Sequence, residues 1–100
     1  MRIRFEDEDL ERLAYDATYQ TKRWAADVTT AYRRVIQRLD AAVDDGDLYA
    51  QRSLHFEHLQ GDRLGTSSLR INLKYRLIVR LITEDNGRMA IVIDARNHYR

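Results

Sequence analysis

The chain has 100 residues, of which 44% are hydrophobic and 33% charged, which is typical of one globular domain over residues 1–100 and not of a disordered segment. It contains no cysteine, and this excludes disulfides and thiolate metal sites. The N-terminal segment turns acidic where a signal peptide needs an apolar run, and no stretch reaches membrane-spanning length. We therefore expect a cytoplasmic protein that does not contact a membrane.

The charge is divided unevenly along the chain. Residues 1–50 hold 8 Lys/Arg and 11 Asp/Glu, a net charge of −3, whereas residues 51–100 hold 9 and 5, a net charge of +4. The interval 63–83 contains no acid at all. Such a local field attracts anions and marks the five cations of this interval as candidate contacts for a polyanion. They are Arg63, Arg70, Lys74, Arg76 and Arg80.

The first half of the chain predicts a strand and two helices. Arg2–Phe5 alternates polar and apolar residues, as a half-buried strand does. The acidic run Glu6–Asp9 suits a helix N-terminus, and apolar residues at helical spacing extend that helix for about four turns, to between Thr18 and Thr21. A longer helix carries one apolar stripe from Trp24 to Val43. Turn-forming residues at 44–47 are expected to end it.

Three arginines, Arg33, Arg34 and Arg38, lie largely on the polar side of this second helix. We interpret them as a solvated helix face, with a second phosphate-binding strip as the alternative. Further on, the segment His55–Leu59 is expected to be a short strand or a single turn, followed by a loop with turn glycines at 61 and 65. The His55-x-x-His58 spacing could serve a metal on a helix, but no third ligand is evident. We expect polar rim histidines and no metal or other cofactor.

The last third of the chain predicts paired strands. From Leu69 to Leu81 every odd position is apolar and most even positions are polar or cationic, which is the period of a strand with one buried face. Thirteen residues exceed the usual strand length, so a reversal is expected at residues 72–74. A three-residue loop there pairs Ile71 with Tyr75 and places Arg70 opposite Arg76. The element order as a whole predicts an α+β fold, with an N-terminal strand and a two-helix hairpin packed on a small twisted antiparallel sheet.

A second hairpin is expected at residues 85–87, with Gly87 in the left-handed position. This three-residue loop pairs Glu84 with Arg88, and therefore Ile78 with Asp94 and Arg76 with Arg96, and it brings Lys74 near His98. One sheet face then collects cations that repel one another, and a bound anion would relieve this repulsion. The members of this predicted anion site are Arg70, Arg76, Arg96, Asp94, His98, Tyr99 and Lys74. The simpler alternative is that each arginine extends into solvent.

These residues resemble those of a known family, the HigB toxins of the RelE/ParE superfamily. The resemblance covers about residues 54–82. It rests on the motif Leu54-x-x-Glu57-x-Leu59-x-Gly61-Asp-Arg63-x-Gly65-x-x-Ser68-x-Arg70-Ile-Asn72, followed by Tyr75-Arg76-Leu77. The ending Asp94-Ala-Arg-Asn-His-Tyr-Arg100 departs from the Asp-Tyr-His ending usual in HigB-like chains and is closer to that of RelE.

The resemblance implies a RelE-like fold and a metal-independent endoribonuclease that enters the ribosomal A site and cuts mRNA. It also implies inhibition by a HigA-like antitoxin with a helix-turn-helix domain, and it is compatible with a toxin–antitoxin heterotetramer. Arg76 matches the family arginine for the scissile phosphate. Arg96 and Tyr99 match the RelE-like ending, for phosphate stabilisation and for proton transfer or base stacking.

His98 has the side chain best suited to act as general base or acid, with Asp94 as its orienting partner. Glu57 lies where HigB-like chains carry Glu or His, and it joins the predicted RNA-binding set. The other members of that set are Arg70, Lys74, Arg63, Arg80 and His58. Two alternatives stay open at this point: a ParE-like DNA gyrase inhibitor, and a non-catalytic module that binds nucleic acid or protein.

Overall fold

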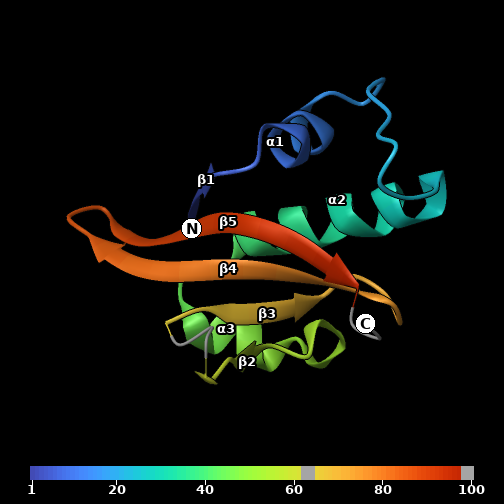
Figure 1. Cartoon of the computed structure of the whole chain (residues 1–100). Coiled ribbons are helices and arrows are strands. Elements are labelled where there is room, and N and C mark those ends of the chain that lie inside the picture. The colour runs from blue at the N-terminus through green and yellow to red at the C-terminus, as the bar shows by residue number, and fades with distance from the viewer. Residues whose placement is uncertain (62–64, 98–100) are drawn as a thin grey trace.

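The computed structural model describes residues 1–61 and 65–97. Five strands form one sheet in the order β1-β5-β4-β3-β2. Figure 1 shows helices α2 and α3 behind strands β3 to β5, so the near face of the sheet is bare. The predicted α+β architecture is confirmed. In chain order the elements are β1 (Arg2–Phe5), α1 (Glu8–Tyr15), α2 (Ala26–Ala41), α3 (Asp45–Ala50), the 3₁₀ turn η1 (Arg52–Leu54), β2 (Glu57–His58), β3 (Ser67–Arg70), β4 (Tyr75–Glu84) and β5 (Gly87–Asn97).

Strand pairing is antiparallel except at one edge. Strands β2, β3, β4 and β5 pair with their neighbours in antiparallel fashion, whereas β1 pairs parallel to β5, with Ile3 opposite Ala90. The predicted antiparallel pairing is confirmed for β2 to β5, and the direction of β1, for which the sequence made no prediction, is parallel. The long connection between β1 and β5 explains the parallel edge. It runs through the helices and the other strands, and a connection of this length lets the chain come back beside β1 in the same direction.

Helix α1 is shorter than predicted. It begins at the expected acidic segment, where the Asp7 carboxylate accepts a hydrogen bond from Leu10 N at 2.9 Å, but it ends at Tyr15. The next residue, Asp16, has an extended backbone and accepts bonds from the amide and the hydroxyl of Thr18 at 3.0 and 2.7 Å. This local side-chain turn competes with further helix and stops α1 near its second turn.

Helix α2 matches the prediction to within two residues at each end. Of its three arginines, Arg33 is not a solvated side chain: it donates to the carbonyl oxygens of Leu13 at 2.8 Å and Asp16 at 2.9 Å at the C-terminal end of α1. The acidic turn after α2 also begins another helix. Asp44 caps a new helix, α3, which the sequence analysis missed.

The hydrophobic core lies between the helices and one face of the sheet. Helix α2 contributes Tyr32 and Leu39, both 0% exposed, and the sheet contributes Leu77 and Val79 of β4, also 0% exposed. The Tyr32 hydroxyl donates to Leu10 O at 2.6 Å, which satisfies the one polar atom that this large side chain brings into the core. Burial raises the pKa of Tyr32 well above its ordinary range, so the phenol stays neutral.

The first predicted hairpin is confirmed. Strand β3 pairs with β4 so that Arg70 is opposite Arg76 and Leu69 is opposite Leu77. The turn is closed by Ile71 N donating to Tyr75 O at 3.0 Å, as the three-residue loop requires. The Asn72 carboxamide oxygen accepts from Lys74 N at 2.9 Å and from Tyr75 N at 2.8 Å, which explains why this residue suits the turn.

The second hairpin is confirmed only in part. Glu84 pairs with Gly87, not with Arg88, and Arg88 pairs with Thr83, whose hydroxyl accepts from the Arg88 guanidinium at 3.0 Å. The register then shifts between Ile78 and Val79, because β5 contains one extra residue at position 93. Beyond this bulge the predicted pairs occur, with Ile78 opposite Asp94 and Arg76 opposite Arg96.

The bulge reverses which residues of β5 face the helices. Before it, Ala90 and Val92 lie in the core, and after it Ala95 packs against the core. Even-numbered side chains thus move from the helix side to the bare side, as a single inserted residue must cause. Asp94 and Arg96 reach the bare face for this reason.

Candidate nucleic-acid interface

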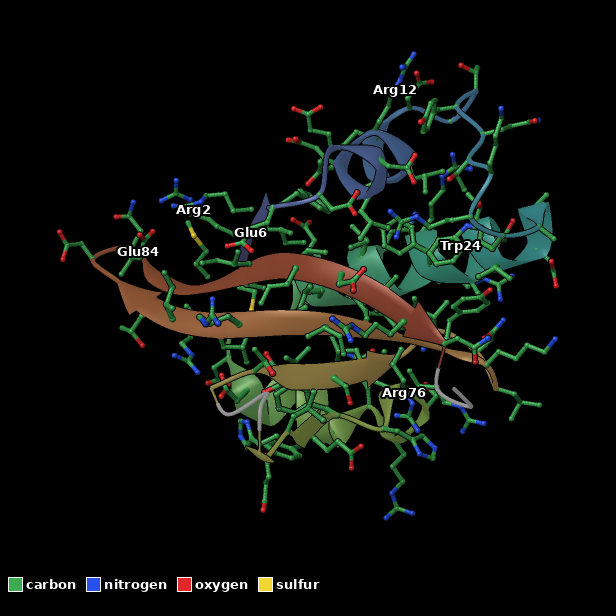
Figure 2. The ribbon with its side chains drawn as sticks, viewed as in Figure 1. Arg2, Glu6, Arg12, Trp24, Arg76 and Glu84 are labelled. Atoms are coloured by element: carbon green, nitrogen blue, oxygen red, sulfur yellow. The ribbon has the colours of Figure 1, made fainter. Side chains whose placement is uncertain are left out.

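Three arginines from three strands form a row across the bare face of the sheet. Arg70 of β3 is opposite Arg76 of β4, and Arg76 is opposite Arg96 of β5. Because Leu77 packs in the helix-side core and strand side chains alternate, Arg76 faces away from the helices. We call Arg70, Arg76 and Arg96 the arginine row. Figure 2 shows Arg76 at one end of the sheet, far from Glu84 at the tip of the β4–β5 hairpin.

The arginine row carries more positive charge than its acidic neighbour neutralises. Asp94 accepts from Arg96 Nε at 2.9 Å, in a pair that is about half exposed on the arginine side. In the part of the chain that the structure describes, no carboxylate pairs with Arg70 or Arg76. Like charges opposite one another on a sheet repel, so this surface favours an anionic ligand. Asp94 is thus paired with Arg96. The orienting contact predicted between Asp94 and His98 falls outside the described residues.

His55 connects two members of the arginine row. Its Nε2 lies 3.0 Å from Arg70 Nη1, and its carbonyl oxygen accepts from Arg76 Nη1 at 3.5 Å. A guanidinium can only donate, so Nε2 is the acceptor in this contact. No local sequence pattern predicts this role. The residue follows η1 with φ +44°, a left-handed conformation that is uncommon for residues other than glycine.

Other predicted residues lie on the same bare face. Glu57 of β2 is opposite Ser68, Ser68 is opposite Ile78, and Ile78 is opposite Asp94, so these residues face the same side of the sheet. Arg80 is exposed and opposite Ile91. Arg4 of β1 is opposite Ile91 from the other side and was not predicted, because the parallel pairing of β1 with β5 could not be derived from local pattern.

Two predicted residues lie away from the arginine row. His58 is opposite Ser67, on the helix side of the sheet. Its Nδ1 is 2.8 Å from Ser67 Oγ, and its ring is 6.2 Å from that of Tyr49. Lys74 is in the β3–β4 turn and lines a separate cavity of about 420 Å³ with Trp24. Three further predicted residues lie outside the described residues. They are Arg63, His98 and Tyr99.

The segment between α1 and α2 is fixed beside the start of β4. The Trp24 ring packs on Tyr75 at 5.2 Å, next to Arg76. Arg23 holds this segment to α1, donating to Asp9 at 2.9 Å and to Asp7 at 2.8 Å. Burial alone would raise the pKa of Asp9, but bonds from Tyr19 and Thr21, with the charge of Arg23, lower it overall.

The described residues contain no group of three or more His, Cys, Asp or Glu side chains able to hold a metal ion. The cations described on the bare face are guanidinium groups, which bind phosphate oxygens through fixed pairs of donors. Within the same residues, no helix is long and apolar enough to cross a membrane.

Comparison with known proteins identifies relatives at the level of sequence. Residues 3–96 match the family model of the HigB-like toxins, described as "RelE-like toxin of type II toxin-antitoxin system HigB". The chain is 35% identical over 78 residues to Toxin HigB-1 of Vibrio cholerae, which covers 78% of this chain and 81% of that protein.

Comparison of structures identifies the same fold. A YoeB/ParE toxin from Agrobacterium tumefaciens superposes with a TM-score of 0.60 at 19% identity, over 99% of this chain and 100% of that one. YafQ from E. coli superposes with a TM-score of 0.62 at 11% identity, over 99% of this chain and 96% of that one. The match of the family model over nearly all described residues agrees with this shared architecture. The chain therefore belongs to the HigB-like toxins, the RelE-like toxins of type II toxin-antitoxin systems.

Proposed function

We propose that this toxin is a metal-independent endoribonuclease that cuts mRNA in the A site of the ribosome and so inhibits translation. The observation that supports this proposal is the arginine row, which aligns three guanidinium groups on a bare sheet face with only Asp94 as a paired acid among the described residues. RNA cleavage without a metal needs cations around the phosphorus, a base for the attacking 2′-hydroxyl and an acid for the leaving 5′-oxygen.

In this mechanism Arg76 binds the scissile phosphate, because it is the central residue of the row. Arg70 and Arg96 flank it and stabilise the charge that develops on the phosphate oxygens as the 2′-oxygen attacks phosphorus. The 5′-oxygen leaves with a proton, and a 2′,3′-cyclic phosphate remains on the upstream fragment. The ring of His55 holds Arg70 in place, and Asp94 holds Arg96.

Proton transfer is assigned to His98, with Tyr99 as proton donor or stacking surface, and Glu57 as a further acidic group on the same face. Lys74, Arg63, Arg80 and His58 are assigned to RNA binding outside the reacting atoms. For His58 this requires RNA to reach the helix side of the β2 edge, where the side chain lies.

We further propose a cytoplasmic location and a cognate HigA-like antitoxin with a helix-turn-helix domain as partner, in a toxin–antitoxin heterotetramer. Support comes from a relative of the same fold, YoeB of Staphylococcus aureus, which was solved in a heterotetrameric complex with YefM. Co-expression with the product of a neighbouring small reading frame, followed by size-exclusion chromatography, tests the partner. Co-elution at the mass of two toxins and two antitoxins is the expected result.

The cleavage experiment adds purified toxin to translating ribosomes with a reporter mRNA and maps 5′ ends by primer extension. We expect new ends inside the message, and we expect Arg76→Ala to reduce the cleavage rate by about 10²–10³-fold, as loss of a donor to a developing oxyanion does. Arg12→Ala is the control, because Arg12 lies on α1 over the Tyr19 ring and away from the sheet face.

An intact message at toxin concentrations that stop growth would contradict the ribonuclease proposal. Inhibition of DNA gyrase supercoiling by the same preparation would then identify the ParE-like activity. Cleavage by Arg76→Ala at the rate of the Arg12→Ala control would leave the ribonuclease in place and remove Arg76 from its mechanism. Circular dichroism of each variant checks that the fold is kept.

A further inference from the structure

A cavity of about 300 Å³ opens between helix α2 and the end of strand β3. Its polar lining consists of donors from α2, η1, β3 and the β3–β4 turn, and none of the described residues that line it is acidic. Val35 contributes to its apolar part. The polar lining residues are Arg34 and Arg38 of α2, Ser53 of η1, Arg70 of β3 and Asn72 of the β3–β4 turn.

The two helix arginines point to the same side of α2. Arg34 and Arg38 are four residues apart, a spacing that places side chains one above the other on a helix. Both are exposed, and the pairing of like charges at this spacing disfavours the helix unless an anion lies between them. Arg38 Nη1 donates to Ser53 Oγ at 2.8 Å, which fixes its direction. Arg34 makes no hydrogen bond or ion pair to any described residue.

The uncharged donors are also held in place by bonds that leave a hydrogen free. Asn72 uses its side-chain oxygen to accept two turn amides, from Lys74 and Tyr75, so its Nδ2 group remains to donate into the cavity. The Ser53 hydroxyl accepts from Arg38 and can donate its own hydrogen. Guanidinium, hydroxyl and carboxamide donors together suit the oxygens of a phosphate group.

Arg70 belongs both to this cavity and to the arginine row. Arg70 therefore connects the arginine row on the bare face with the cavity beside α2, where Arg34 and Arg38 lie. A ligand with several phosphates in sequence can contact both parts at once, whereas a single small anion can occupy only one.

We propose that the Arg34–Arg38 cavity is a second phosphate site, which binds the backbone of the substrate RNA strand next to the nucleotides held by the arginine row. This inference rests on the proposed RNA substrate and extends it to a second contact. It assigns to α2 a role in holding the strand, in place of the solvated helix face that the sequence suggests for Arg34 and Arg38.

The test measures fluorescence anisotropy with a labelled, non-cleavable 2′-O-methyl single strand of about ten nucleotides, the length of a typical single-strand site. The variant is Arg34→Ala with Arg38→Ala. The charge-matched control is Arg12→Ala with Lys22→Ala, which removes the same charge from α1 and the segment that follows it, outside the cavity lining. Arg34→Lys with Arg38→Lys keeps the charge, and thermal unfolding followed by circular dichroism verifies the fold of all three.

We expect the alanine pair to weaken RNA binding about five- to tenfold near physiological salt and to make the slope of log K against log salt shallower by about 1.4, the value for two lost phosphate contacts on a single strand. The control pair should bind as the wild type does, and the lysine pair should keep the slope. Equal slopes for the alanine pair and the control would overturn the proposal.

A second arm uses empty ribosomes in place of the single strand. If the alanine pair loses affinity only for ribosomes, the cavity contacts ribosomal RNA and the substrate-strand proposal is wrong. The cleavage assay is scored separately. If the toxin cleaves mRNA but the alanine pair and the control give the same salt slope, only this inference is wrong. If the slope changes as expected but the toxin does not cleave RNA, only the endonuclease proposal is wrong.

Discussion

At the scale of single residues, His55 and Arg76 show how the backbone prepares the candidate site. The left-handed backbone of His55 turns the chain from η1 toward β2, and this turn brings both its ring and its carbonyl oxygen to the arginine row. A non-glycine residue in this conformation costs of order 1 kcal/mol or more. The contacts of His55 with Arg70 and Arg76 offset part of this cost.

Replacing His55 separates the backbone cost of its left-handed conformation from the contribution of its side chain to RNA binding. We expect His55→Gly to keep or raise the free energy of unfolding, by up to about 1 kcal/mol, because glycine adopts positive φ without strain. RNA affinity should fall severalfold, since Arg70 loses its bond to Nε2. His55→Asn is the companion variant, because Asn tolerates the left-handed region. Urea denaturation and RNA anisotropy measure the two effects, and unchanged RNA affinity in both variants would contradict the positioning role.

At the scale of elements, α3 is attached to β5 through one bidentate ion pair. Arg88 donates to both carboxylate oxygens of Asp45 at 2.9 Å, and each side chain is roughly a quarter exposed. The hydrogen bonds from Arg88 lower the pKa of Asp45 below its ordinary value of 3.8, against the opposing effect of burial. The same pair raises the pKa of Arg88. This contact also keeps Arg88 opposite Thr83 and sets the register of the hairpin.

The ion pair should contribute to stability in a pH-dependent way. A lowered carboxyl pKa means that the contribution is complete above pH 3.8 and is lost as the pH falls through the lower pKa of the folded state. A double-mutant cycle with Asp45→Asn and Arg88→Gln at pH 7 should give a coupling free energy of about 0.5–1 kcal/mol. The coupling should vanish in strong acid. A coupling of zero at pH 7 would show that the pair does not stabilise the fold.

The β5 bulge sets which residues of β4 and β5 lie opposite each other, and this register can be tested. Because Arg76 is directly opposite Arg96, their Cα atoms should be about 4.5–5.5 Å apart, within the range that a disulfide spans. The chain has no cysteine, so Arg76→Cys with Arg96→Cys introduces the only thiols. We expect this pair to oxidise readily and Arg76→Cys with Ala95→Cys to stay reduced, because Ala95 faces the core. Thiol titration after mild oxidation distinguishes the two double variants. Faster oxidation of the Arg76→Cys with Ala95→Cys pair would show that the bulge is misplaced.

At the scale of the whole molecule, the sheet has one sealed and one open face. The helices cover the face that carries Leu77, whereas none of the described helices lies on the open face. Ile91 is 8% exposed there, with Arg4 and Arg80 opposite it on either side. Long arginine stems can shield such apolar surface while their charged ends remain in water. The open face thus stays free for a ligand without exposing the apolar residues beneath it.

Stability should therefore depend on the sealed face. Leu77→Ala removes a side chain that is 0% exposed near the start of β4, and we expect it to lower the free energy of unfolding by about 2–5 kcal/mol through lost burial and a residual cavity. Ile82→Ala, half buried on the open side, should cost clearly less. Urea unfolding with an unchanged m-value measures both, and equal costs would show that the open face carries as much of the stability as the core.

The sequence by itself determined the strand alternation, the main helix and the pairing of Arg70 with Arg76, because these depend on local periodicity and a short turn. It also placed Arg76 opposite Arg96, although the structure reaches this pair by a two-residue turn and a bulge in place of the three-residue loop. Only the tertiary structure decided the parallel edge of β1, the left-handed His55, the separation of His58 from the row and the cavity beside α2. Each of these depends on contacts between residues distant in sequence, whose geometry no local pattern encodes.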